Sequence, residues 1–245
     1  RDSLFTYNRV EDRLDYYYNL EGVRMSCVTE DSAGNLYVGT MNNGLYMIDH
    51  NKKWLNYFPK KDITCIYEDS KKSIWVGTKD DGLFRLDRNG GITNYGTAPH
   101  QNMLSSSYVR CVVEDNLGNY WIGTFKGLDK LDVTTGTFTH YSKDNKPYSL
   151  SNSSIICMMK DRQGTFWIGT YYGGVNLFNP DYEIYTYYYP DESQKGKLTS
   201  PFAGRMTEDS NGGIWIATEG GGVNYLDKKT KTFTEYKHDA TKNSL

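Results

Sequence analysis

Several features that would assign a chain to a functional class are absent from this sequence. Its 245 residues contain no apolar run approaching the roughly 20 residues of a membrane-spanning helix, so we expect no direct membrane insertion. Basic residues are not in excess, because 28 Lys and Arg stand against 30 Asp and Glu, for a net charge of −2. This balance argues against nucleic acid as a partner of the segment.

The chain is also poor in the residue groups that build enzyme and metal sites. It has four histidines and four cysteines, with no His-x-His, HExxH or CxxC spacing and no paired carboxylate cluster. Acid–base or metal-assisted catalysis requires such a group. We therefore expect no enzyme activity in this segment, no catalytic residues, no metal and no cofactor.

The sequence does contain a phrase of eleven residues that occurs in five copies. It reads EDSAGNLYVGT at 30–40, EDSKKSIWVGT at 68–78, EDNLGNYWIGT at 114–124, KDRQGTFWIGT at 160–170 and EDSNGGIWIAT at 208–218. The Gly-Thr step is spaced by 38, 46, 46 and 48 residues, with Ala217 in place of the fifth glycine. Self-similarity at a nearly fixed period is the signature of a repeat architecture.

Four short strands, named A to D, can be assigned within each copy. Strand A enters the phrase, as at Met25–Thr29, and an Asp-x-x-Gly turn follows in which Asp caps amides and Gly takes a positive φ. Lys72 replaces that glycine in the second copy, so we expect a strained turn or another turn type there. Strand B carries an aromatic before a β-branched residue, and strand C ends on Asp or Asn. Strand D ends on a tyrosine that we expect to pack within its unit: Tyr57, Tyr95, Tyr141, Tyr187 and Tyr236.

Four strands in a unit of about 40–45 residues with a fixed aromatic are typical of a β-propeller blade. We predict an all-β propeller of four-stranded antiparallel blades at 23–58, 61–96, 107–142, 153–189 and 202–237. Residues 1–18 align only with strands C and D and form a half blade, and 238–245 match the lead-in to a further blade. We therefore interpret the chain as a fragment of a ring with an expected seven blades, whose remaining blades are its partners.

The phrase E-D-x-x-G-x-Φ-W-[VI]-G-T, followed by a Gly turn and G-[LV]-x-x-[LY]-[DN], resembles the two-component regulator propeller repeat over essentially the whole chain. The resemblance implies the periplasmic sensor of a hybrid two-component histidine kinase of Bacteroidetes that controls polysaccharide-utilisation genes. Kinase and signalling modules would then lie elsewhere in the parent chain. The repeats also faintly resemble streptogramin lyases. We favour a lyase less, because it would need a histidine with a nearby acid and metal, and only His100 and His238 fall in D–A connectors.

We interpret the repeated phrase as framework. Asp31 and its equivalents make the turn, and the aromatics Trp75, Trp121, Trp167 and Trp215 are expected to pack between neighbouring blades. The cysteines Cys27, Cys65, Cys111 and Cys157 stand three residues before the phrase, and Arg205 takes that place in the fifth copy. Equivalent positions on successive blades fan around an axis, whereas a disulfide needs Cα atoms within about 7 Å. We therefore expect free thiols that fill the inner strands.

Ligand-binding residues are expected where the framework varies. In a propeller the B–C turns and D–A connectors open on one face beside the axis, where ligands are usually held. We predict an oligosaccharide-binding site there, with candidates Arg24, Asn42, Asn43, Arg110, Phe125, Lys126, Tyr171, Tyr172 and Arg205. Two alternatives remain: an ordinary solvated rim, and a protein-interaction or homodimerisation propeller. In the second case these residues would scatter, and a flat apolar patch would appear on a sheet flank or open edge.

Overall fold

A computed structural model of the chain describes residues 3–96, 103–144, 149–179, 184–190, 196–238 and 241, with the backbone alone at 184–187. The described residues form 22 strands and no helix, which confirms the all-β prediction. No helix in this part of the chain has the length and hydrophobicity needed to cross a membrane.

The strands form one two-stranded hairpin and five four-stranded antiparallel sheets. The hairpin pairs β1 (Ser3–Asn8) with β2 (Arg13–Asn19). The sheets are β3 (Met25–Glu30), β4 (Leu36–Thr40), β5 (Leu45–Ile48) and β6 (Trp54–Tyr57); β7 (Ile63–Glu68), β8 (Ile74–Thr78), β9 (Leu83–Leu86) and β10 (Ile92–Tyr95); β11 (Val109–Glu114), β12 (Tyr120–Thr124), β13 (Leu128–Leu131) and β14 (Phe138–Tyr141); β15 (Ile155–Lys160), β16 (Phe166–Thr170), β17 (Gly174–Asn179) and β18 (Ile184–Tyr188); and β19 (Ala203–Glu208), β20 (Ile214–Thr218), β21 (Gly222–Asp227) and β22 (Thr232–Tyr236).

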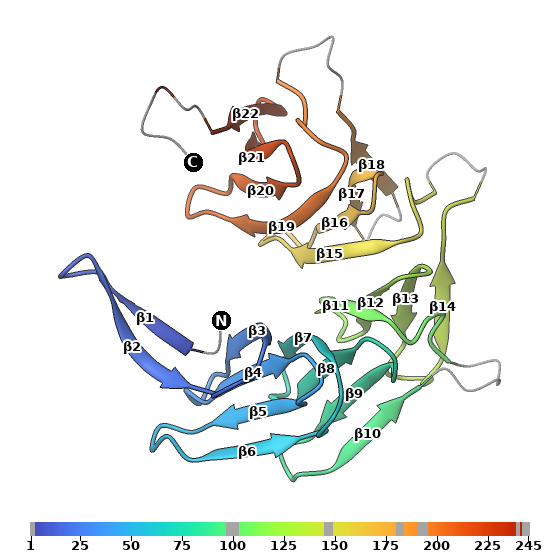
Figure 1. The fold of residues 1–245 in the computed structure, drawn as a ribbon. Coiled ribbons are helices and arrows are strands. Elements are labelled where there is room, and N and C mark those ends of the chain that lie inside the picture. The colour runs from blue at the N-terminus through green and yellow to red at the C-terminus, as the bar shows by residue number, and fades with distance from the viewer. Residues whose placement is uncertain are drawn as a thin grey trace.

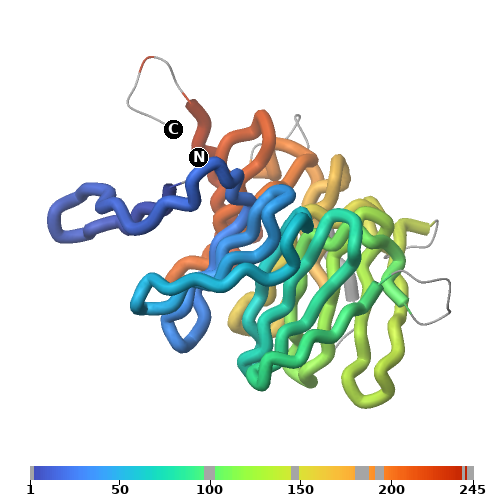
Figure 2. The backbone as a smooth tube through the Cα atoms, turned by 60° about the horizontal axis from the view of Figure 1, so that its bottom comes forward, coloured from blue at the N-terminus to red at the C-terminus, as the bar shows by residue number. Residues whose placement is uncertain are grey.

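The five sheets follow one another around a central axis as propeller blades (Figure 1). Their first strands, β3, β7, β11, β15 and β19, lie innermost, and each contacts the next one along the chain. The hairpin β1–β2 extends the arc beyond the first blade and projects from the body in Figure 2. Apart from His238 and Thr241, the expected lead-in at 238–245 lies outside the described residues, as does His100. The further blades remain a prediction.

The aspartate of each phrase uses both carboxylate oxygens within its own blade. In the second blade the Ser73 N–H donates to Asp69 Oδ1 (2.8 Å), and the Trp75 indole N–H donates to Oδ2 (2.9 Å). The same indole bond recurs at Trp121, Trp167 and Trp215. Lys72 keeps the turn type of the glycine it replaces, with φ 67° and its N–H donating to the Asp69 carbonyl (2.9 Å). Of the two expectations for this turn, strain or another turn type, the structure shows the first, because Lys72 is a non-glycine residue at positive φ.

Apart from Trp215, which is half-buried, the strand-B aromatics are buried where two blades meet. The Trp75 ring lies 4.2 Å from the Tyr120 ring of the next blade and stacks on Tyr95 of its own blade. Trp121 and Trp167 contact the next blade in the same way, whereas Trp215 contacts Tyr225 and Tyr236 of its own blade.

One tyrosine of strand D was predicted wrongly. The residue of the fourth blade at the register position of Tyr141 is Tyr188, not Tyr187, and the Tyr188 ring stacks on Trp167. Strand β18 has five residues where β6, β10 and β14 have four, and its pairing places Tyr188 opposite Val175. That register is the one in which Tyr141 lies opposite Leu128 in the third blade.

The first residue of the second to fifth phrases joins its blade to the preceding one. Glu114, which is buried, accepts hydrogen bonds from the Ser70 N–H and hydroxyl, both at 2.7 Å. Glu68 binds Ser32 in the same way. In the fourth copy the residue is Lys160, which donates to the Asn116 side chain instead (3.2 Å). We call this contact the inter-blade clasp.

The four cysteines are free thiols, as expected, and they explain the phrase glycine. Each cysteine lies opposite that glycine in the strand register, as Cys111 lies opposite Gly123. A Cβ on Gly123 would lie 2.4 Å from the Cys111 sulfur and 2.6 Å from a methyl carbon of Ile155 in the next blade. In the fifth blade the opposed pair is Arg205 and Ala217. The glycine is therefore required where a thiol and the next blade both pack against it.

Candidate functional site

Both sets of variable loops are tied together at one end of the axis, which we call the mouth. The first residue of each B–C turn donates its N–H to the carbonyl of the residue that precedes strand A. These bonds, of 2.8–3.1 Å, join Met41 to Arg24, Lys79 to Asp62, Phe125 to Tyr108, Tyr171 to Ser154 and Glu219 to Phe202. The Gly-Thr threonine fixes each B–C turn further, as the Thr40 hydroxyl donates to the Gly44 carbonyl (2.6 Å).

A cavity of about 590 Å³ opens at this mouth and receives residues from all five blades. Its aromatic lining residues are Tyr108, Tyr171 and Phe202, and its cationic ones are Lys79, Arg110 and Arg205. Asp62 is the carboxylate among the lining residues. The volume lies in the range of about 300–1,000 Å³ that small-ligand sites occupy.

The structure brings only part of the predicted site together. Three of the nine candidates line the cavity: Arg110, Tyr171 and Arg205. Two more place an aromatic ring against a lining residue: the Phe125 ring stacks on Tyr108, and the Tyr172 ring contacts Tyr171. The remaining four are exposed on the rim and do not line it: Arg24, Asn42, Asn43 and Lys126.

Apart from Arg24, the sequence analysis missed the residue that stands directly before strand A. In successive blades this position holds Arg24, Asp62, Tyr108, Ser154 and Phe202. Asp62, Tyr108 and Phe202 line the cavity. The signal was available, because an alignment of the copies shows a position that varies freely next to a constant strand.

Three aromatic rings, of which two are exposed and that of Phe202 is half-buried, form one cluster on the side of the fourth and fifth blades. The Tyr171 ring lies 4.5 Å from the Tyr172 ring and 5.3 Å from the Phe202 ring, both in edge-to-face geometry. Tyr172 is 61% exposed and has φ 56°. A bulky residue at positive φ is strained by about 1–2 kcal/mol. The turn therefore holds an aromatic ring beside the cavity at a cost in backbone energy.

Arg110 lines the cavity but already has a structural role. In the first two blades a hydroxyl at this position donates to the carbonyl that opens the next inner strand: Ser26 to Ile63 (2.6 Å) and Thr64 to Val109 (2.5 Å). Arg110 makes the equivalent bond to the Ile155 carbonyl (3.0 Å) and a second one to Ser154. Its guanidinium also lies 4.5 Å from the Tyr108 ring centroid.

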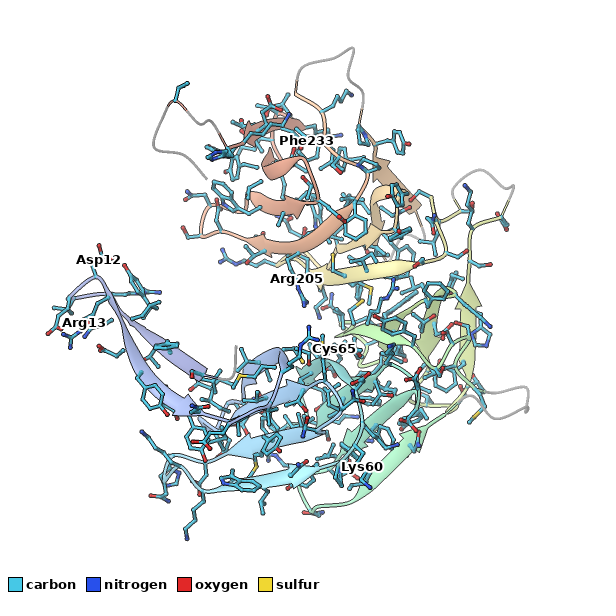
Figure 3. The ribbon with its side chains drawn as sticks, viewed as in Figure 1. Asp12, Arg13, Lys60, Cys65, Arg205 and Phe233 are labelled. Carbon is cyan, nitrogen blue, oxygen red and sulfur yellow. The ribbon has the colours of Figure 1, made fainter. Side chains whose placement is uncertain are left out.

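Arg205 differs from Arg110 in having no hydrogen-bond acceptor or carboxylate partner among the described residues. It points from β19 into the central opening, toward the side of Cys65 (Figure 3). Burial raises the pKa of Cys65 and of Cys157 to about 12, and the Arg205 charge opposes that rise at both thiols. Arg205 also lines a cavity together with Cys65 and Cys111 of two other blades, so it lies close to the axis.

One group has the composition of a catalytic site but not its geometry. The His140 ring nitrogen lies 2.8 Å from one oxygen of buried Asp129, and the Ser105 hydroxyl donates to the other oxygen (2.9 Å). Because the aspartate stands between them, His140 cannot take the Ser105 proton. Asn176 occupies the Asp129 position in the next blade and likewise accepts an N–H of its connector, that of Ser151 (2.9 Å). Asp129 and Asn176 therefore each anchor the connector that enters their own blade, through Ser105 and Ser151.

Metal-binding geometry is also missing among the described residues, which contain no group of three or more His, Cys, Asp or Glu arranged to hold an ion. None of the described histidines lines the mouth cavity. What the described chain presents is a propeller whose variable loops surround an axial cavity.

Four segments of the chain match the sequence model of the family described as two component regulator propeller: residues 57–80, 103–126, 149–172 and 197–220. Each match runs from the end of one blade through strands A and B of the next. The chain therefore carries the two-component regulator propeller repeat at the second to fifth copies of the phrase, which confirms the resemblance for those copies.

Solved structures with the same fold include two bacterial receptor segments and one enzyme. The extracellular domain of the hybrid two component system BT3049 from B. thetaiotaomicron has a TM-score of 0.73 and 21% identity, covering 95% of this chain and 31% of that one. The extracellular domain of the hybrid two component system BT4673 from the same organism has a TM-score of 0.53 and 18% identity. That match covers 96% of this chain and 40% of the BT4673 chain. Virginiamycin B lyase from Staphylococcus aureus has a TM-score of 0.67 and 14% identity. That match covers 87% of this chain and 70% of the lyase chain. A search of curated proteins found no match.

Proposed function

We propose that this chain is the extracytoplasmic ligand-sensing propeller of a two-component regulator, and that its mouth recognises a glycan fragment. The repeat family and the fold shared with extracellular domains of two-component systems support the sensor role. In this proposal a histidine kinase elsewhere in the parent chain converts binding into control of polysaccharide-utilisation genes. The sensor segment would then lie in the periplasm.

The observation that carries the glycan proposal is the lining of the mouth cavity. Tyr171 and Phe202 offer aromatic surface on which the apolar face of a sugar ring can stack, and charged groups from other blades can bind its polar substituents. The strained backbone of Tyr172 supports a binding role, since an exposed ring gains little from packing.

Isothermal titration calorimetry against a panel of acidic and neutral oligosaccharides tests this proposal. We expect at least one to bind, and Tyr171→Ala combined with Phe202→Ala to weaken its binding at least tenfold. Trp54→Ala is the matched control, because Trp54 is also an exposed aromatic but lies on outer strand β6. Absence of binding to every sugar, or binding that survives the double variant, would contradict the proposal.

A second candidate is a dimerisation or protein-interaction propeller, and the N-terminal hairpin favours it. Phe5 lies opposite Tyr16, and Tyr7 lies opposite Leu14. These four side chains are between 54% and 66% exposed and form an apolar strip across the hairpin. A concentration-dependent dimer in sedimentation velocity that is lost in Phe5→Ser with Tyr16→Ser, together with no sugar binding, would favour this candidate.

A further inference from the structure

Positive charge gathers along the axis of a chain whose net charge is −2. The mouth cavity is lined by Lys79, Arg110 and Arg205 against one carboxylate, Asp62. A second axial cavity of about 370 Å³ shares both arginines with it, and its lining adds Lys160 and no carboxylate. Asp62 is itself engaged, because its carboxylate accepts the Asn42 N–H (2.6 Å).

These cations are not equally available to a ligand. Arg110 is held by the Ile155 carbonyl and the Ser154 hydroxyl, and Lys160 donates to Asn116. The side chains of Lys79 and Arg205 have no hydrogen-bond or carboxylate partner within the described ranges. Of these two, only Arg205 belongs to both cavities.

The place of Arg205 in the repeat explains why its side chain is free. In the other four blades this position holds a cysteine that packs on the opposed glycine. In the fifth blade the opposed residue is Ala217, and a guanidinium is too large and too polar for a thiol-sized apolar site. The side chain therefore turns to the axis, where Figure 3 shows it facing the central opening.

We infer that the ligand of the mouth carries an oxyanion, a carboxylate or a sulfate on a sugar, and that Arg205 binds it. The planar guanidinium offers paired N–H donors that match the two oxygens of such a group. Lys79, across the cavity in the second blade, adds a second positive charge. Tyr171 and Phe202 contact the sugar ring. This inference rests on the proposed function and narrows it to acidic glycans.

The first experiment tests the anion site without any sugar. Inorganic sulfate is titrated at constant ionic strength while the arginine Nε–Hε resonances are followed by NMR, with Arg205 assigned from Arg205→Ala. We expect a saturable shift of the Arg205 resonance. The control is Arg88→Ala, which removes the same charge from an exposed turn outside both axial cavities and should leave the response intact.

The second experiment adds the sugar. Trigalacturonate is compared by calorimetry with its methyl ester, which keeps the stereochemistry and removes the charge, and a sulfated chondroitin disaccharide tests sulfate. We expect an acidic sugar to bind at least tenfold more tightly than the neutral ester, and Arg205→Ala to remove that advantage.

The outcomes separate the two claims. Saturable sulfate binding at Arg205 with no sugar bound sustains the anion site and overturns the glycan proposal. If the acidic sugar and its ester bind equally, and Arg205→Ala leaves both affinities unchanged, the glycan proposal stands and the inference that Arg205 binds an oxyanion is overturned. No response to sulfate and no sugar bound overturns both.

Discussion

Replacing Gly123 by alanine should destabilise the propeller at the contact between the third and fourth blades. The added Cβ would lie 2.4 Å from the Cys111 sulfur and 2.6 Å from an Ile155 methyl carbon. Carbon atoms pack best at about 3.5–4.0 Å, so about 1 Å is missing on both sides. The φ of Gly123 is not positive, so the backbone itself accepts alanine.

Overpacking a well-filled core costs about 1–3 kcal/mol, and we expect the upper half of that range because two blades meet the added atom. Urea unfolding followed by tryptophan fluorescence measures it. With an m-value of about 3 kcal/mol/M, a loss of about 2 kcal/mol lowers the midpoint by roughly 0.7 M.

Two variants test the cause of this loss. Ala217→Gly makes the reverse change where Arg205 has replaced the cysteine, and it should cost no more than about 1 kcal/mol in backbone entropy. Cys111→Ala combined with Gly123→Ala removes one of the two clashes and should recover part of the loss. An unchanged midpoint in Gly123→Ala, or no recovery in the double variant, would refute the argument.

Three further predictions concern the clasp, the strained turn and the ion pair of Asp161 with Lys228. Glu114→Gln should lower the free energy of unfolding by about 1–2 kcal/mol in urea titration, because the charged acceptor of two hydrogen bonds from Ser70 is lost. The control is Glu30→Gln, at the same phrase position but exposed, which should change the free energy of unfolding by less than about 0.5 kcal/mol. Tyr172→Asn should raise stability by about 0.5–1 kcal/mol while weakening sugar binding, since asparagine tolerates positive φ; a lowered melting temperature would contradict this. Burial raises the pKa of Asp161, but the bonds from Lys228 and Trp167 outweigh it and hold the pKa below its usual value. Its contribution to stability is therefore complete above the unfolded pKa of about 3.9 and lost as pH falls through the folded value. Asp161→Asn should flatten the decline of the urea midpoint as pH falls below about 4, and an unchanged decline would show that the pair of Asp161 and Lys228 does not contribute.

The fold could be read from the sequence because every blade solves the same packing problem with the same residues. The turn aspartate, the strand-B aromatic and the Gly-Thr step each have a local cause that the phrase displays. The inter-blade clasp was missed because its partners, such as Glu114 and Ser70, belong to different copies. The choice of Tyr188 over Tyr187 depended on a strand register that two adjacent tyrosines do not reveal.

The cavity of the candidate site could be predicted in location, and its lining residues only in part. The mouth followed from the topology of a blade, which places the B–C turns beside the connectors. Arg110 and Arg205 look alike in sequence, and only the structure shows that one is held by neighbouring oxygens and the other is free. Tyr108 and Phe202 were missed because the residue before strand A differs from copy to copy, so no constant residue type marks it as part of the site.

A crystal structure of the protein with a saturating acidic trisaccharide tests the central claim most directly. We expect the sugar in the mouth cavity, with a ring against Tyr171 and Phe202 and its carboxylate paired with the Arg205 guanidinium. A trisaccharide bound on the N-terminal hairpin or the outer strands, or an empty mouth under those conditions, would contradict it.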